Sequence, residues 1–152
     1  LEFVLDIEGG LSDDPDDPGG LTNFGISSRF HPDVDVESLT QREAVRIYKE
    51  KYWQAFCCPD LAPAFAIALF DGVVNQDQIA VVKMLQGVVG VNTDGLMGPD
   101  TIAAVNRSRD VYSLSMFMSK RVERYMTVSK EKYQTGLVRR ALECYALARS
   151  QM

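Results

Sequence analysis

Residues 61–76 read LAPAFAIALFDGVVNQ. On a helix of 3.6 residues per turn, their apolar side chains surround the axis rather than forming one stripe, which is typical of a helix buried inside a protein. The apolar run over residues 61–70 is about half of the ~18 residues that a membrane-spanning helix needs. The stretch therefore predicts a central helix in the core of a globular protein.

Further helices are expected on both sides of this stretch, because caps, glycines and prolines punctuate the rest of the chain. They are residues 1–8 before Gly9, residues 40–56 after a Thr40–Glu43 capping box, residues 79–89 before Gly90, a helix from Pro99, and two helices in 111–152 that break near Gly136. Residues 9–30 are dense in Gly, Pro, Asp, Ser and Asn, which indicates a loop. The sequence thus predicts one mainly α domain over residues 1–152, with a long Gly/Asp/Pro-rich loop.

The last two expected helices have apolar residues at helical spacing. We expect the buried sides to be formed by Tyr112, Leu114, Met116 and Phe117 in the first helix, and by Leu142, Tyr145 and Leu147 in the second. We expect the basic residues of this region to lie mostly on solvated faces: Lys120, Arg121, Arg124, Lys130, Lys132, Arg139, Arg140 and Arg149.

The chain of 152 residues has a net charge of −5 that is unevenly distributed. Residues 1–43 hold eleven acidic and two basic residues, a net −9, whereas residues 44–152 hold ten acidic and fourteen basic residues, a net +4. An acidic protein without a run of basic residues is not expected to bind nucleic acid. No targeting segment is visible at the start of the sequence, so we expect that any such segment has been removed.

The three cysteines and the single histidine argue against a disulfide framework and against a zinc site. Cys57 and Cys58 are adjacent and Cys144 is distant, which predicts buried free thiols in a reducing compartment rather than a disulfide framework. One histidine is too few for the zinc sites of metal-dependent amidases and peptidases, which need about three protein ligands. We therefore expect no metal and no cofactor, and we expect His31, which precedes Pro32, to be a surface turn residue.

The stretch EGGLSDDPDDPGGLTNFGIS, residues 8–27, holds the residues best suited to catalysis. Glu8 lies at the C-terminus of the first expected helix, beside apolar residues and near four aspartates, and each of these factors raises a carboxyl pKa toward that of a general acid at neutral pH. Glycoside hydrolysis requires such an acid and a second carboxylate, which acts as nucleophile or activates water. Asp17 or a neighbouring aspartate is the candidate for this second role, and Thr22 is a hydroxyl able to hold a water.

Three other interpretations of this acidic loop stay open. Aspartates beside proline and glycine often form only Asx turns and helix caps. Clustered aspartates can bind calcium, although the D-x-D-x-D-G spacing with a closing glutamate is absent. Glu8 can also be an ordinary solvated residue at a helix end.

Several motifs have long, recognisable spacings: E-G-G at residues 8–10, D-P-x-D-P-G-G-x-T-N-F-G-I at 14–26 and Y-x-x-x-Y-W at 48–53. Together they resemble glycoside hydrolase family 108, which comprises phage-type lysozymes (N-acetylmuramidases) and bacterial relatives. The second half is similar to the predicted peptidoglycan-binding segment of that family, through F-D-x-x-V-N at 70–75, Leu85-Gln86 and D-G-L-M-G-P-D-T at 94–101. The family tends to carry Gly-Trp in the tail, where this chain has Gly136-Leu137.

The resemblance implies a lysozyme-like helical domain, with residues 1–90 as the catalytic part and residues 91–152 as a peptidoglycan-binding-like part packed in the same domain. It implies an endolysin-type hydrolase for cell wall degradation and bacteriolysis, which cleaves the β-1,4 bond between N-acetylmuramic acid and N-acetylglucosamine. The family's catalytic glutamate falls on Glu8. A looser similarity to the Glu–Asp–Thr arrangement of other phage lysozymes suggests Asp17 and Thr22, while Asp16 would restore that arrangement's Asp-to-Thr interval.

The candidate substrate-binding residues are amide and aromatic side chains: Asn23, Tyr52, Trp53 and Asn75. Trp53 suits either a core anchor or a surface on which a sugar ring stacks. Asn75 lies one turn after Asp71, so the pair could hydrogen-bond to each other or to an acetamido group. The expected partner is bacterial peptidoglycan, reached in the periplasm after release or export from the cytoplasm, and the expected state is a monomer.

Two alternative functions follow from the same motifs. One is a non-catalytic peptidoglycan-binding or regulatory module that uses residues 94–101 and the tail. The other is a lytic transglycosylase, which also uses one glutamate but leaves anhydro-muramic ends. Whether hydrolysis inverts or retains the anomeric centre depends on the carboxyl separation, which the sequence does not contain.

Overall fold

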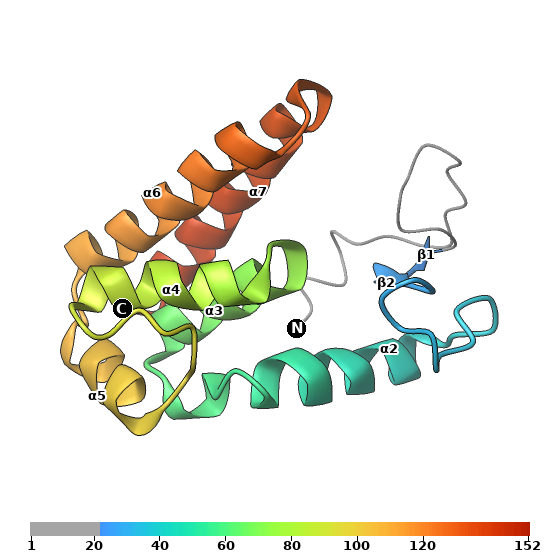
Figure 1. The fold of residues 1–152 in the computed structure, drawn as a ribbon, viewed down its shortest axis with the longest axis horizontal. Helices are drawn as coiled ribbons and strands as arrows, with labels where there is room; N and C mark the ends of the chain where they lie inside the picture. The colour runs from blue at the N-terminus through green and yellow to red at the C-terminus, as the bar shows by residue number, and fades with distance from the viewer. Residues whose placement is uncertain (1–21) are drawn as a thin grey trace. The chain divides into compact units, whose positions relative to one another are not determined.

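The computed structural model describes residues 22–152, and this part of the chain is mainly helical (Figure 1). Its elements are the strands β1 (Thr22–Asn23) and β2 (Ile26–Ser27) and the helices α2 (Gln41–Tyr48), α3 (Pro63–Asn75), α4 (Gln78–Val89), α5 (Pro99–Arg107), α6 (Val111–Val128) and α7 (Glu131–Arg149). A π-helical segment, Lys49–Gln54, follows α2, and a 3-10 turn, Cys58–Asp60, precedes α3. The expected first helix and most of the acidic loop lie outside the described residues.

The chain divides into two compact units, Leu1–Lys51 and Tyr52–Met152. In the second unit, helices from both sides of residue 90 pack against one another, because α3 contacts α4, α6 and α7, while α4 contacts α5 and α6. The sequence segments 63–89 and 99–149 therefore share one core. The organisation of the whole chain as a single domain stays a prediction.

The first unit contains an antiparallel hairpin that the sequence did not indicate. Asn23 lies opposite Ile26, so the turn consists of Phe24 and Gly25 alone. Their φ angles of 49° and 74° are both positive, as a type I′ turn requires. The helix α2 begins as predicted, because the Thr40 backbone N–H donates to the Glu43 carboxylate at 2.9 Å and the Glu43 N–H donates to the Thr40 hydroxyl.

The helix α3 is buried on most sides, as its apolar sequence predicts. Its buried residues are Ala64, Phe65, Ala66, Ala68, Leu69, Phe70, Asp71, Gly72 and Val73. A Cβ added at Gly72 would lie 2.8 Å from a methyl of Val81 on α4 and 3.1 Å from Nε of Arg121 on α6. A side chain at position 72 would thus push these helices apart.

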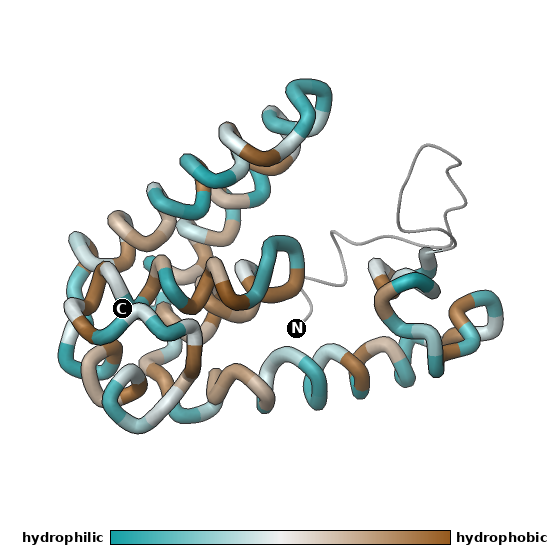
Figure 2. Tube along the Cα trace, in the orientation of Figure 1, coloured by the Kyte–Doolittle hydropathy of each residue, from teal (hydrophilic) through white to brown (hydrophobic). Residues whose placement is uncertain are grey.

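The break between the last two helices lies earlier than expected. The helix α6 ends at Val128 and α7 begins at Glu131, so Gly136 is inside α7. Ser129 and Lys130 have extended backbones with ψ of 147° and 140°, and the turn that they form is hydrophilic (Figure 2). Since this turn contains neither Gly nor Pro, it has no compositional signal.

The prediction of which residues form the buried faces of α6 and α7 is wrong in part. Leu114 and Phe117 are buried as predicted, but Tyr112 is 73% exposed and Leu142 is 61% exposed. Of the other expected positions, Met116 and Leu147 are exposed and Tyr145 is half-buried. The residues of α7 that are buried are Arg140, Ala141, Cys144 and Ala148. The helix therefore turns a stripe of mostly small side chains inward.

Candidate functional site

The residues expected to act in catalysis fall on both sides of the limit of the described structure. Glu8, Asp16 and Asp17 lie outside the described residues. Thr22 is half-buried on β1, with its Cα opposite that of Ser27. The described part of the site is thus the hairpin at the end of the acidic loop.

This hairpin is held from two sides. The buried Asn23 side chain donates from Nδ2 to the backbone carbonyls of Val36 at 3.1 Å and Leu39 at 3.3 Å. The Tyr48 hydroxyl donates to the Phe24 carbonyl at 2.9 Å. Because a bulky residue such as Phe24 rarely has a positive φ, these bonds fix a turn that its own sequence disfavours. The T-N-F-G-I motif thus builds a fixed support for Thr22.

His31 is buried rather than on the surface, which corrects the expectation from sequence. Its backbone N–H donates to the Ser27 carbonyl at 3.0 Å, and its Nδ1 lies 3.4 Å from Nζ of Lys51. Burial, and then the Lys51 ammonium, lower the pKa of His31, so the imidazole is neutral at neutral pH. A histidine before proline resembles a turn residue in sequence, but here it packs inside the first unit.

The aromatic candidates belong to the π-helical segment Lys49–Gln54. Tyr52 and Trp53 are both half-buried. The Trp53 ring meets the ring of Phe70 on α3 edge to face, with centroids 5.4 Å apart and planes at 80°. This edge-to-face geometry is favourable for two aromatic rings, and it holds Trp53 against α3 within the second unit while part of its surface stays accessible.

A buried cluster of charges occupies the core of the second unit. The Asp71 carboxylate accepts from Nη2 of Arg121 at 2.6 Å and from Nε of Arg140 at 2.8 Å. The expectation that both arginines lie on solvated faces is wrong, since Arg121 is 0% exposed and Arg140 is 8% exposed. Burial raises the pKa of Asp71, but the two guanidinium groups outweigh burial and hold this pKa below its usual value.

Polar side chains at the end of α3 complete this cluster. Arg121 also donates to the Ala68 carbonyl and to Oε1 of Gln76, both at 3.0 Å. Asn75 donates to the backbone carbonyl of Asp71 and accepts from the hydroxyl of Tyr125. The Asn75–Asp71 bond considered from sequence is therefore present, with the backbone oxygen as acceptor. Asn75 is tied to the packing of α3 against α6.

The cysteines are free, as predicted, and two of the three are buried. Burial raises the pKa of Cys58 and of Cys144 to about 12, whereas Cys57 is half-buried. In residues 22–152, no group of three or more His, Cys, Asp or Glu side chains is placed to hold a metal ion. Among the helices of that same range, none has the length and apolar character required to cross a membrane.

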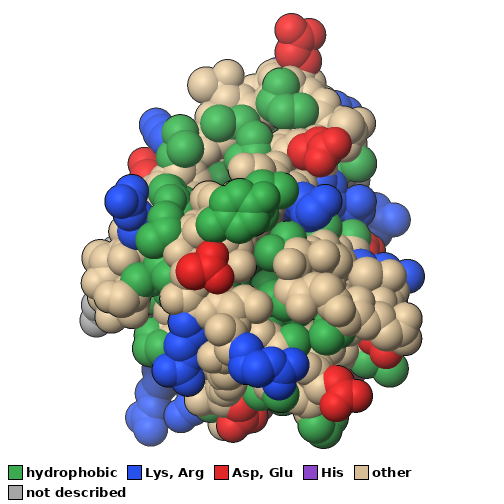
Figure 3. Space-filling view, turned by 90° about the vertical axis from the view of Figure 1, so that its left-hand side faces the viewer, with side chains coloured by type: hydrophobic (Ala, Val, Ile, Leu, Met, Phe, Trp, Pro, Cys, Tyr) green, Lys and Arg blue, Asp and Glu red, His purple; other side chains and the backbone are tan. Residues whose placement is uncertain are grey.

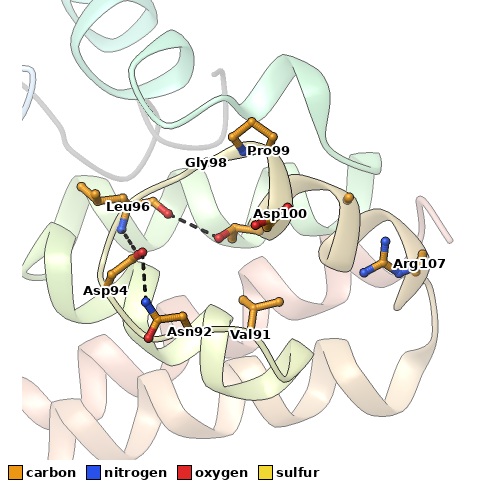
Figure 4. A pocket seen from close by; sticks show the side chains of 10 residues that line it. Val91, Asn92, Asp94, Leu96, Gly98, Pro99, Asp100 and Arg107 are labelled. Atoms are coloured by element: carbon orange, nitrogen blue, oxygen red, sulfur yellow. Dashed lines mark hydrogen bonds between the residues drawn. The ribbon is translucent and has the colours of Figure 1, made fainter.

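A hollow of about 570 Å³ lies between α5 and the preceding loop (Figure 4). It is lined by Val91, Asn92, Asp94, Leu96, Gly98, Pro99, Asp100, Thr101, Ala103 and Arg107, and is called the α5 hollow below. Residues 94–101, singled out in the sequence, supply most of its wall. The contribution of Arg107 was missed, because it lies two turns beyond the motif and has no signal other than its helical spacing.

One side chain organises the loop of the α5 hollow. The Gln86 amide, buried on α4, donates to the Asp94 carboxylate at 2.8 Å, the Leu96 carbonyl at 3.0 Å and the Thr101 hydroxyl at 3.1 Å. Its oxygen accepts from the Gly95 N–H at 2.8 Å. Both ends of one amide group thus hold the loop to the helix.

Charges of both signs are interspersed with hydrophobic side chains on the face shown in Figure 3. Lys and Arg side chains lie beside Asp and Glu side chains there, without an extended region of one sign. A surface of this kind gives little long-range attraction to a polyanion.

Comparison with known proteins identifies the class. A family model described as Glycosyl hydrolase 108 matches residues 1–76, half of the chain. The chain is also similar to the solved structure of Brucella abortus SagA, with 31% identity and a TM-score of 0.89 over 99% of this chain and 91% of that one. The search of curated protein sequences found no match to this chain. The protein is a glycoside hydrolase with a mainly α, lysozyme-like fold. It belongs to glycosyl hydrolase family 108.

Proposed function

We propose that this protein is an N-acetylmuramidase that cleaves the β-1,4 bond between N-acetylmuramic acid and N-acetylglucosamine, with Glu8 as general acid. Family membership and the similarity to SagA support a peptidoglycan hydrolase in general. One observation carries the finer proposal: the family match over residues 1–76 includes Glu8, the acidic loop and the hairpin that follows it. In this proposal the enzyme is a monomer that reaches the periplasmic face of the cell wall after release or export.

The proposed reaction uses two carboxyl groups. Glu8 donates its proton to the glycosidic oxygen as the bond from that oxygen to the anomeric carbon breaks. Asp17 supplies the carboxylate that attacks the anomeric carbon or activates the incoming water, and Thr22 holds that water. Addition of water to the anomeric carbon leaves a new reducing end. The bonds that fix the hairpin support this role of Thr22, since a water-holding hydroxyl needs a fixed position.

The proposed sugar contacts divide into two kinds. Tyr52 and Trp53 offer aromatic surface to the apolar faces of sugar rings, and the contact with Phe70 keeps the Trp53 ring in one orientation. The side-chain Nδ2 atoms of Asn23 and Asn75 donate to backbone carbonyls. We therefore propose that these two amides act on the substrate mainly by positioning their own segments of the chain.

The test compares wild type, Glu8→Gln and the control Glu123→Gln on purified peptidoglycan. Turbidity loss and new reducing ends are measured together. We expect Glu8→Gln to lower the rate by at least about 100-fold, because general acid catalysis contributes on the order of 10²–10⁴. Glu123 is exposed on α6, so its variant should keep the wild-type rate.

Each other result points to a specific alternative. Equal rates for Glu8→Gln and wild type would remove Glu8 from the mechanism. Wall binding without lysis by the wild type would indicate a binding or regulatory module. Lysis that yields anhydro-muramic ends, detected by mass spectrometry, would indicate a lytic transglycosylase instead of a hydrolase.

A further inference from the structure

The first turn residue of the hairpin β1–β2 has a side chain that the turn itself does not need. Phe24 has a φ of 49°, in the left-handed region that Asn, Asp and Gly adopt at little cost. Asn-Gly or Asp-Gly would form the same type I′ turn, so phenylalanine at this position costs conformational energy without improving the turn. The role of the ring therefore lies outside the backbone of the hairpin.

Packing does not use the whole of the Phe24 ring either. Phe24 is half-buried, whereas Asn23 before it and Ile26 after the turn are buried. Within residues 22–152 its ring meets no other aromatic ring, in contrast to the Trp53 ring, which lies against Phe70. An aromatic ring at the turn of a hairpin thus keeps part of its surface accessible to a ligand.

The backbone that carries Phe24 is held in place by buried side chains. Its carbonyl accepts from the Tyr48 hydroxyl at 2.9 Å, and the neighbouring Asn23 amide donates to the carbonyls of Val36 and Leu39. A residue in a sparsely populated conformation persists only where its surroundings fix it, and such residues cluster at active sites and ligand-binding sites. The hairpin therefore presents the Phe24 side chain from a fixed backbone, so little conformational entropy is lost when a ligand binds.

The position of Phe24 brings it close to the proposed chemistry. It lies two residues after Thr22, so their Cα atoms are at most about 7.6 Å apart. Thr22 is the residue proposed to hold the water that adds to the anomeric carbon. A glycan whose anomeric carbon lies beside Thr22 therefore brings a sugar ring within reach of Phe24, and the apolar face of such a ring packs well on an aromatic surface.

We propose that Phe24 contacts the substrate, with its ring against the apolar face of an N-acetylated sugar beside the bond that is cleaved. Tyr48 and Asn23 are positioning residues that act through the backbone of Phe24. This inference rests on the proposed function, since it takes the glycan strand as the ligand and Thr22 as its neighbour. It assigns the contact to the first unit, whereas Tyr52 and Trp53 belong to the second.

The test is titration calorimetry of a tetrasaccharide of alternating N-acetylglucosamine and N-acetylmuramic acid. The parent protein is the whole chain with Glu8→Gln, and Phe24→Asn, Phe24→Leu or Phe24→Tyr is added to it. We expect Phe24→Asn and Phe24→Leu each to weaken binding about tenfold, because both remove the aromatic face. Phe24→Tyr keeps that face and should bind within about twofold of the parent. If the parent still cleaves the probe, KM values of the same variants are compared instead.

Thermal unfolding separates a substrate contact from a contribution to the fold. Phe24→Asn places the preferred Asn-Gly pair in the type I′ turn, so its Tm should be no lower than that of the parent while its affinity falls. The control Phe30→Asn makes the same substitution at a phenylalanine that is 74% exposed, lies in the same unit and has no positive φ. This control should leave the affinity unchanged.

Three results would overturn the proposal. Parent-like affinity for Phe24→Asn or Phe24→Leu would show that the aromatic face is not used. A lower Tm for Phe24→Asn would assign the ring to the fold. An equal loss of affinity in Phe30→Asn would show that the effect is not specific to the hairpin.

Hydrolysis of purified peptidoglycan separates this inference from the proposed function. If the wild type releases reducing ends through Glu8, and Phe24→Asn binds and cleaves as the wild type does, the inference fails while the proposed function stands. If the tetrasaccharide binds through Phe24 but the wild type releases no reducing ends, the proposed function fails while the glycan contact stands.

Discussion

Replacing Asp71 by asparagine tests whether the buried cluster is held together by charge. Asparagine keeps the shape of the side chain but leaves the guanidinium of Arg121, which is 0% exposed, without its carboxylate. Removal of one partner from a buried ion pair costs about 3–5 kcal/mol. This is a large share of the roughly 5–15 kcal/mol by which a domain is usually stable. For a chain of this length, each kcal/mol lowers Tm by about 3 °C, so Asp71→Asn should lower it by about 9–15 °C.

The assay is urea unfolding followed by circular dichroism, with Glu143→Gln as the matched control. Glu143 forms an exposed ion pair with Arg139, four residues earlier on α7, at 3.8 Å, and exposed pairs at this helical spacing contribute about 0.3–0.5 kcal/mol. The control should therefore unfold within about 0.5 kcal/mol of wild type. A free energy of unfolding for Asp71→Asn that is equally close to wild type would refute the role given to the cluster.

The pH dependence provides a second check on the same variant. The folded-state pKa of Asp71 is lowered, so its stabilising effect is present above the unfolded-state pKa of about 3.9 and is lost as the pH falls through the folded-state value. The unfolding free energies of wild type and Asp71→Asn should thus converge in acid. A difference that persists unchanged after Asp71 is protonated would show that shape, rather than charge, is responsible.

Three further predictions concern two glycines, the hairpin and the thiols. Gly95→Ala should lower the free energy of unfolding by about 1–2 kcal/mol, because Gly95 has a positive φ and an added Cβ would lie close to a methyl of Ile79 on α4. Gly136→Ala, inside α7 with open space around it, should raise the free energy of unfolding by about 0.5–1 kcal/mol. Urea unfolding measures both changes, and changes of the same sign and size would contradict this prediction. Asn23→Ala removes the donor to two backbone carbonyls and should lower the free energy of unfolding by about 1–3 kcal/mol in the same assay. An unchanged free energy of unfolding would contradict this prediction. Cys57 should react with a thiol reagent in the native protein, whereas the buried Cys58 and Cys144 should react only after unfolding. Rapid modification of all three thiols in the native protein would contradict this prediction.

The helix starts were predictable because their causes are local. The capping box of α2 needs only Thr40 and Glu43, three residues apart, and α4 ends at Gly90, whose φ is 74°. The apolar run of α3 likewise contains in its own sequence the information that it is buried. In contrast, the extended backbone at Ser129 that ends α6 has no local marker, and the break was therefore expected at Gly136.

The errors at buried positions have a different origin. Arg121 and Arg140 are buried where both pair with Asp71, which is 50 and 69 residues away in sequence, and helical periodicity does not contain such a pairing. The inward face of α7 was misplaced for a related reason. Large Leu142 outweighs small Ala141 in an apolar pattern, yet close helix packing selects the smaller side chain.

For the candidate site, the sequence indicated which segments matter but not how their residues are arranged in space. The hairpin was missed because type I′ turns are usually marked by Asn-Gly or Asp-Gly, whereas here Phe24 takes the first position. The motif at 94–101 was recognised, but its dependence on Gln86 follows only from the packing of the loop against α4. Arg107 was missed because helical spacing along α5 is its only signal.

The amide of Gln86 restricts how the length of its loop can vary. Glutamate at this position would lack the donor, leucine would lack both groups, and asparagine would be one methylene too short to reach the same partners. An extra residue between Asp94 and Leu96 would displace a bonded group, whereas one at residues 91–93 lies outside the stretch that bonds to the Gln86 side chain. Insertions that the fold tolerates should therefore cluster just after α4, a pattern that engineered loop libraries can reveal.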